Sequence, residues 1–486
     1  MKTRLEEHYL TAVRPSLKIN IICFTILRYF NMLRNMKLIN KFNNFKSNLL
    51  PSNQNKYIYF LAMFYLLILS LTIVFGRPFV GIYIFNQQIG KGIVLIGALF
   101  FLSVFILNYI FKDKIESNFK SVINILLLIF FAFLLNLLVN GFNTDLYVFR
   151  SSSYIWSLGY CVMGYYFLSK LKKELILLVI SLSAFALYFV SIINYPNFII
   201  DIFISNSDKF QLIKAADSLL IFVLLNFLIE KYSKLSENIK FAILIFSFGL
   251  FLPYYIYQSR GSLLAALLFF SLSLLAYRRF IFKNILISII YTMIASLLFY
   301  GSSYAIAFIS VDEDLLPDNF SDANSGIIDN ILTEKEPRSG FLTFYIEDGR
   351  LKSLDATTDW RLDIWQDLID DLNLKNKLSL GFGYLEPFEI MNDPSQPGRL
   401  GRDGLNEHVH NYFFNILGRG GILQLLLFLS FYISIFTIWI KKGYKKIDFI
   451  KLFLPILIVS SLDVTMEGVH FPFIFLSFLG YILSSD

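Results

Sequence analysis

The sequence predicts an all-α polytopic membrane protein with about twelve transmembrane helices. Hydrophobic residues make up 56% of the 486 residues and charged residues only 16%, whereas an ordinary soluble domain contains about 25% charged residues. The apolar residues form repeated runs of about 20 residues, which is the length that a helix needs to cross the hydrocarbon core. The runs do not alternate between apolar and polar residues, which disfavours a transmembrane β-barrel.

Twelve segments have the length and hydrophobicity of a membrane-spanning helix. They lie near 57–76, 92–111, 122–140, 147–168, 174–194, 212–232, 240–258, 261–277, 284–308, 421–440, 449–466 and 470–485. The seventh and eighth segments are separated mainly by Gln258–Gly261, so a count of eleven or thirteen stays open. The chain therefore divides into four regions: a basic tail (1–56), spans one to nine (57–309), a large loop that we expect to be partly helical (310–410), and a re-entry helix with spans ten to twelve (411–486).

Lysine and arginine residues indicate the orientation of the spans, because short cytoplasmic loops are enriched in them. With a cytoplasmic N-terminus, the tail and the inner loops carry 27 of these residues and the short outer loops carry six. This distribution predicts that both termini are cytoplasmic and that the large loop, between spans nine and ten, is periplasmic. It also accounts for the net charge of +7, so we expect no nucleic-acid partner. Residues 16–33 of the tail are expected to form an interfacial helix.

The large loop contains a predicted amphipathic helix over 357–372. At about 100° per residue, Arg361 lies in the middle of the apolar face and five aspartates lie on the opposite face. Two interpretations are open: the arginine extends along the apolar surface into water, or its guanidinium faces an anion in a cleft against the membrane domain.

A second arginine, Arg260, begins the eighth span directly after an outer loop. Charged groups at membrane depth usually face a cavity or a partner, and the positive end of a helix dipole favours an anion. We expect Arg260 to bind either an anionic ligand or the headgroups of lipids.

Two of the four histidines, His408 and His410, lie where the large loop re-enters the membrane. On the helix that we expect there, two residues differ by about 200°, so the imidazoles would point apart. This disfavours a shared metal ion, and we expect no metal and no cofactor. His410 is in phase with Phe413, Phe414 and Leu417, so it is the candidate general base. The alternative is a polar helix start with a solvent-facing histidine.

Two further motifs have weaker functional interpretations. Gly381 and Gly383 surround Phe382 but lack the third glycine of a nucleotide-binding loop, so we expect a turn. Asp463, Glu467 and His470 lie between the last two spans. We expect a solvated loop there, and a cluster that orients a sugar is the alternative.

Taken together, these motifs resemble the O-antigen ligase and O-antigen polymerase superfamily of bacterial envelope glycosyltransferases. The matching pieces lie in the C-terminal half of the chain: Ser259-Arg260-Gly261, Arg361 with Trp365, Gly381-Phe382-Gly383, and His410-Asn411. In the ligases, His-Asn is followed after nine residues by a glycine, here Gly421. After two more residues comes a glycine, threonine or tyrosine, where this chain has Gln424. Ligase and polymerase both stay open.

The resemblance implies transfer of a glycan from undecaprenyl diphosphate at the periplasmic face of the bacterial inner membrane. The acceptor would be lipid A-core for a ligase or a lipid-linked repeat unit for a polymerase, and a chain-length regulator protein would be a further partner beside membrane lipids. Arg260 and Arg361 would bind the diphosphate, and His410 would activate the acceptor hydroxyl, with inversion and without a metal. Four residues would support this site: His408, Asn411, Gly381 and Gly383. A secondary transporter is the alternative function, although such carriers usually have two related halves.

Overall fold

The computed structural model describes residues 56–110, 117–143, 145–193, 195–207, 213–307, 343–393, 399 and 407–484. These residues are mainly helical, with two short antiparallel hairpins. One hairpin pairs β1 (Tyr83–Ile84) with β2 (Gln87–Gln88), and the other pairs β3 (Phe344–Glu347) with β4 (Arg350–Ser353). The predicted interfacial helix over 16–33 lies outside the described residues.

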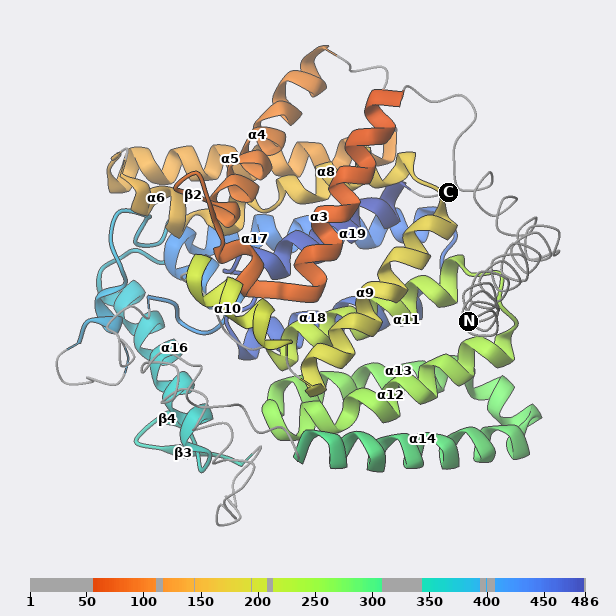
Figure 1. Cartoon of the computed structure of the whole chain (residues 1–486). Coiled ribbons are helices and arrows are strands. Elements are labelled where there is room, and N and C mark those ends of the chain that lie inside the picture. The colour runs from red at the N-terminus through yellow and green to blue at the C-terminus, as the bar shows by residue number, and fades with distance from the viewer. Residues whose placement is uncertain are drawn as a thin grey trace, which may run out of the picture. The chain divides into compact units, whose positions relative to one another are not determined.

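Helices overlap all twelve segments that were predicted to span the membrane (Figure 1). Eleven of the segments coincide with one helix each: α3 (Lys56–Gly81), α4 (Ile89–Ile110), α5 (Ser117–Asn140), α9 (Lys173–Ile193), α11 (Ala215–Tyr232), α12 (Glu237–Gln258), α13 (Arg260–Lys283), α14 (Ile285–Ala307), α17 (Tyr412–Lys441), α18 (Lys446–Leu462) and α19 (His470–Ser484). Within the described residues, seven helices are long and apolar enough to cross a membrane: α3, α5, α9, α12, α13, α14 and α17. The chain is therefore an α-helical multi-pass membrane protein, while the count of twelve spans stays a prediction.

The fourth predicted span, 147–168, is not one continuous helix. It is divided into α6 (Leu146–Ser151), α7 (Ser153–Trp156), α8 (Gly159–Phe167) and one 3₁₀ turn, η1 (Leu168–Lys170). At the breaks, the hydroxyls of Ser152 and Ser157 donate to carbonyls of the preceding turn, which competes with regular helical hydrogen bonding. Gly159 also lies against α4 so closely that a Cβ atom would be 1.9 Å from the Gly97 carbonyl oxygen. The hydropathy pattern contained no sign of these interruptions.

A short helix that was not predicted, α10 (Asn197–Asn206), lies between α9 and α11. Ser207 follows it and forms a β-bridge with Ile82, and its hydroxyl donates to the Pro78 carbonyl at 3.0 Å. With ten residues, α10 is too short to cross a bilayer. It therefore packs beside the end of α3 without adding a span.

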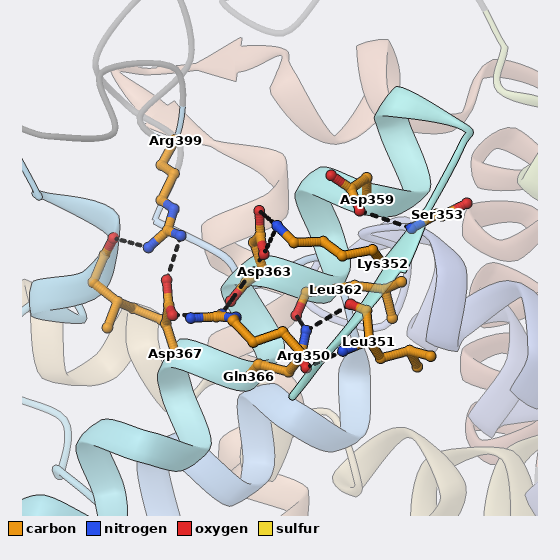
Figure 2. A network of polar contacts seen from close by, with 11 residues as sticks. Arg350, Leu351, Lys352, Ser353, Asp359, Leu362, Asp363, Gln366, Asp367 and Arg399 are labelled. Carbon is orange, nitrogen blue, oxygen red and sulfur yellow. Dashed lines mark hydrogen bonds and ion pairs between the residues drawn. The ribbon is translucent and has the colours of Figure 1, made fainter. Parts of the chain in front are cut away.

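The described part of the large loop contains α16 (Ala356–Leu374), which confirms the helix predicted over 357–372. Its apolar face packs in a cluster with Phe388, Met391 and Val409. Its acidic face binds the β3–β4 hairpin and Arg399, as Figure 2 shows, through ion pairs that involve Asp363 and Asp367. The helix is therefore held by apolar burial on one side and by ion pairs on the other.

The Gly381-Phe382-Gly383 segment is non-helical, as predicted, and packs against a kink in α17 at Gly421. The backbone N–H of Phe382 donates to the Gly418 carbonyl (2.8 Å), and that of Gly383 donates to the Arg419 carbonyl (3.0 Å). Gly381 has a φ of +71°, and a Cβ atom there would lie 2.5 Å from the Arg419 carbonyl oxygen. This glycine is thus required by backbone conformation and by a close approach, and the segment fixes the loop to α17.

Candidate active site

Arg361 lies half-buried on α16, and at about 100° per residue it is on the face opposite Asp363 and Asp367, which form the ion pairs described above. Burial lowers the pKa of Arg361, and the negative charges of Asp463 and Asp355 act in the opposite direction. Among the described residues its buried Nε has no hydrogen-bond partner. A half-buried guanidinium with an unpaired donor can bind an added anion through charge-assisted hydrogen bonds.

His410 lies against the same turn of α16 as Arg361. Its ring contacts Trp360 edge-on, with 5.0 Å between the ring centroids. Burial and the positive charge of Arg361 lower the pKa of His410 to about 4, although the charge of Asp463 opposes this shift. The imidazole is therefore neutral at pH 7 and can accept a proton from a hydroxyl.

We predicted that the two histidines lie on a helix, and this prediction is wrong, because α17 begins only at Tyr412. His410 instead has left-handed backbone with a φ of +52°, which is uncommon for a residue with a side chain. The surroundings of the two rings nevertheless differ. Burial and the charges of Arg419 and Arg150 lower the pKa of His408 to about 3, whereas His410 faces α16.

The residues on both sides of His410 are held by hydrogen bonds. The indole Nε1 of Trp365 donates to the Val409 carbonyl at 2.7 Å. The side-chain oxygen of Asn411 caps α17 by accepting two backbone N–H groups of the first turn, at 2.9 and 3.1 Å. Its amide nitrogen donates to the Ser461 carbonyl at the end of α18, at 3.0 Å. These bonds join α16, α17 and α18 around the bend and stabilise its strained conformation.

Arg260 begins α13, as predicted, and its Nη1 lies 2.5 Å from Oδ1 of Asp355. Asp355 caps α16 by accepting hydrogen bonds from the backbone N–H (3.1 Å) and the hydroxyl (2.7 Å) of Thr358. Although burial raises its pKa, the bonds from Thr358 and the charge of Arg260 hold the pKa of Asp355 below the usual value. The ion pair ties the start of α13 to the start of α16, so both predicted arginines lie near one carboxylate.

The cluster between the last two spans is buried, and the expectation of a solvated loop is wrong. Glu467 and His470 are only 7% and 8% exposed. His470 Nε2 lies 3.0 Å from Oδ1 of Asp217 on α11, and burial raises the pKa of Glu467 to about 8. The reason is tertiary: α19 packs against α8 and α11 and excludes water from the turn that precedes it.

Sequence reasoning missed two acidic partners of this site. Asp355 and Asp217 were given no role, yet Asp355 holds Arg260 and Asp217 holds His470. For Asp355 a signal was available, since an aspartate just before an amphipathic helix is a favoured N-cap. For Asp217 there was none, because its partner lies 253 residues away in the sequence.

A third arginine close to these segments, Arg419 of α17, is 3% exposed and has a different set of contacts. It donates to the Glu386 carbonyl and, at 2.9 Å, to the Tyr147 hydroxyl. Its guanidinium also lies over the Phe388 ring, 4.2 Å from the centroid. These contacts fix α17 to the loop and to α6, which is a structural role.

Gln424, where the sequence departs from the ligase motif, belongs to a buried polar network. Its side-chain oxygen accepts hydrogen bonds from the hydroxyls of Tyr154 (2.7 Å) and Tyr384 (2.5 Å). The glutamine thus connects α17 to α7 and to the loop segment that contains Gly383.

The comparison with known proteins agrees with the resemblance in the motifs. Residues 241–429 match the family model described as O-antigen ligase. The matched region includes Arg260, Arg361 and His410 and extends to the second half of α17. No curated protein matches the chain. This match supports the O-antigen ligase and polymerase superfamily and a role in O-antigen assembly.

Proposed function

We propose that this protein transfers a glycan from undecaprenyl diphosphate to an acceptor hydroxyl at the periplasmic face of the inner membrane, as an inverting glycosyltransferase. The observation that carries the proposal is the pairing of a neutral histidine, His410, with a half-buried arginine, Arg361, at the junction of α16 and α17. One group can accept a proton and the other can bind an anion.

Arg361 and Arg260 would bind the diphosphate of the donor. A guanidinium binds phosphate oxygens through two parallel, charge-assisted hydrogen bonds. Asp355 would orient Arg260 through their ion pair. The guanidinium carries five N–H donors, and a single carboxylate oxygen cannot accept all of them, so donors would be left for the diphosphate. Negative charge accumulates on the departing diphosphate in the transition state, so these two cations would stabilise the transition state more than the bound donor. In this proposal the arginines supply the positive charge and no metal is needed.

His410 would remove the proton from the acceptor hydroxyl as the oxygen attacks the anomeric carbon. The new glycosidic bond forms on the face opposite to the breaking bond between the anomeric carbon and the diphosphate oxygen, so the configuration inverts. The proton passes to the imidazole and the electron pair of the broken bond leaves with the diphosphate. The acceptor would be lipid A-core in a ligase or a lipid-linked repeat unit in a polymerase, where a chain-length regulator would assist.

The test is transfer by the purified protein in proteoliposomes that contain an undecaprenyl-diphosphate-linked glycan and an acceptor. His410→Ala should lower the transfer rate by about 10²–10⁴ and should still bind the donor. His408→Gln, which alters the other ring of the pair, should lower the rate by less than about tenfold. If His410→Ala transferred glycan at the wild-type rate, the mechanism would have no base and the proposal would be wrong.

A further inference from the structure

A cavity of about 1130 Å³ lies at the opposite ends of the helices that form the candidate active site. Its wall comes from α11, α12, α13 and α18, from the start of α9, and from the segment Trp439–Lys445 at the end of α17. On α11, Asp217 belongs to the active-site end and Lys231 to the cavity. These positions are fourteen residues apart in the sequence, about 21 Å along a helix. The cavity therefore lies toward the other end of the helices, which the distribution of lysine and arginine predicts to be cytoplasmic.

Cationic side chains predominate in the wall of this cavity. Six lysines and arginines and three acidic residues line it, the cations being Lys173, Lys231, Lys240, Arg278, Arg279 and Lys445. Two of the acids, Glu230 and Asp448, are already paired with the buried Lys451, at 2.6 and 3.5 Å. Since Lys451 is not part of the wall, these two acids are already engaged by a cation outside it, which leaves six cations and one further acid in the wall.

Lys231 is the most enclosed of these cations. Its Nζ lies 3.9 Å from the centroid of the Trp439 ring and 3.2 Å from that of Tyr444. Within the described residues, this buried ammonium has no hydrogen-bond partner and no ion pair. Aromatic faces compensate only part of the cost of removing an ammonium from water, so an anion inside the cavity would stabilise it further.

Arg278 and Arg279 lie at the exposed side of the cavity, near the end of α13. Neither forms an ion pair with any residue that the structure describes. Trp439, Tyr444 and Tyr277 line the same space, and such aromatic residues are typical of the interface between membrane and water. These residues indicate that the cavity lies near the depth of the lipid headgroups.

We propose that this cavity binds a phosphate group, carried either by an anionic lipid headgroup or by a soluble phosphate. Basic pockets between membrane helices recognise anionic headgroups in this way, and arginine pairs add forked hydrogen bonds to phosphate oxygens. Much of the wall, including Lys173, Lys231 and Trp439–Asp448, lies outside the O-antigen ligase match at 241–429. The proposed phosphate site is therefore separate from the candidate active site for glycan transfer. A bound anion would connect the ends of α11, α13 and α18.

The experiment measures lipid binding to the full-length, delipidated protein by native mass spectrometry, with phosphatidylglycerol, phosphatidylcholine and inorganic phosphate as probes. Each cation near an anionic headgroup contributes about fivefold in affinity. The variant Arg278→Gln/Arg279→Gln should therefore bind phosphatidylglycerol about 25-fold more weakly than the wild type. Lys283→Gln is the matched control, because Lys283 is an exposed cation on the last turn of the same helix and does not line the cavity. It should bind phosphatidylglycerol as the wild type does.

A third variant, Lys231→Met, tests the enclosed cation separately from the exposed arginines, and it should also weaken phosphatidylglycerol binding while leaving phosphatidylcholine binding unchanged. If millimolar inorganic phosphate displaces phosphatidylglycerol, the site takes soluble phosphate. If it does not, the site is specific for the lipid headgroup. The proposal is wrong if the wild type shows no preference for phosphatidylglycerol and no phosphate binding, or if Lys283→Gln loses as much affinity as the cavity variants.

Discussion

The two faces of α16 use arginine in different ways. On the acidic face, Arg350 lies 2.6 Å from Asp367, and Arg399 binds the other oxygen of the same carboxylate (Figure 2). On the opposite face, Arg361 forms neither a hydrogen bond nor an ion pair with any described residue, although it is half-buried and two carboxylates influence it from a distance. The helix is the same, so the difference arises from what each face packs against.

This difference separates arginines that hold the structure together from one that is prepared for a ligand. A guanidinium whose donors are occupied by fixed carboxylates contributes to stability, and an added phosphate would have to displace its partners. Arg361 has no such partner to displace, and its neighbour His410 is neutral and therefore does not compete for an anion. Substitutions on the two faces should accordingly affect different properties of the protein.

Of the substitutions on the two faces of α16, those of Arg361 should have the largest effect. Arg361→Ala should lower the transfer rate by about 10²–10³, the usual cost of losing one group that stabilises developing negative charge. Arg361→Lys should be nearly as damaging, since it keeps the charge but loses the forked geometry. The rate of transfer and the melting temperature should be measured on the same preparations, because the activity should fall without a loss of stability.

The matched control is Arg350→Gln, which removes the guanidinium that β4 places on the acidic face of α16. This substitution should leave the transfer rate within about threefold of the wild type. If Arg361→Lys kept full activity while Arg350→Gln lost it, the two faces would have the reverse of the roles that we assign.

A smaller effect is expected from pH. Because the pKa of His410 is lowered to about 4, the neutral and active form persists until the pH falls through that value. At pH 5.5 the enzyme should retain almost all of its transfer rate, whereas a histidine with the usual pKa of about 6.5 would leave roughly a tenth. The measurement is kcat/KM between pH 4.5 and 8 under conditions where the protein stays folded. A fall centred near pH 6.5 would contradict the enclosed position of His410.

The sequence predicted those parts of the site that depend on helical periodicity. Arg361 was placed correctly on its helix face, because an amphipathic helix of this length has a strong 3.6-residue pattern. His410 lies beside α16 near Arg361, but not on the helix that we predicted, and its role stays a prediction. Asn411 is a strong N-cap residue, and reading it as one would have started α17 at Tyr412 and left His410 outside the helix.

The features that the sequence could not show all depend on tertiary packing. Gly164 and Gly480 let α8 and α19 approach closely, and the burial of Glu467 is a consequence of that approach. Hydropathy along the chain does not reveal which helices pack against each other. The basic cavity also depends on tertiary packing. Its cations were used to predict the orientation of the spans, but they come together around Lys231 only because α11, α13 and α18 pack against one another.

The smallest effect is expected at Asp363, on the acidic face of α16. Its carboxylate lies 2.9 Å from Nζ of Lys352 and 3.7 Å from Nη2 of Arg350, and it is 27% exposed. Partly exposed ion pairs contribute about 0.2–1 kcal/mol each, so Asp363→Asn should lower the melting temperature by only a few degrees. The transfer rate should stay within about twofold of the wild type, since the Arg361 face is untouched. High salt should reduce the difference in melting temperature, because screening weakens the wild-type pairs. A large loss of transfer in Asp363→Asn, with the melting temperature unchanged, would mean that the acidic face also contacts the substrate and that the two faces do not act separately.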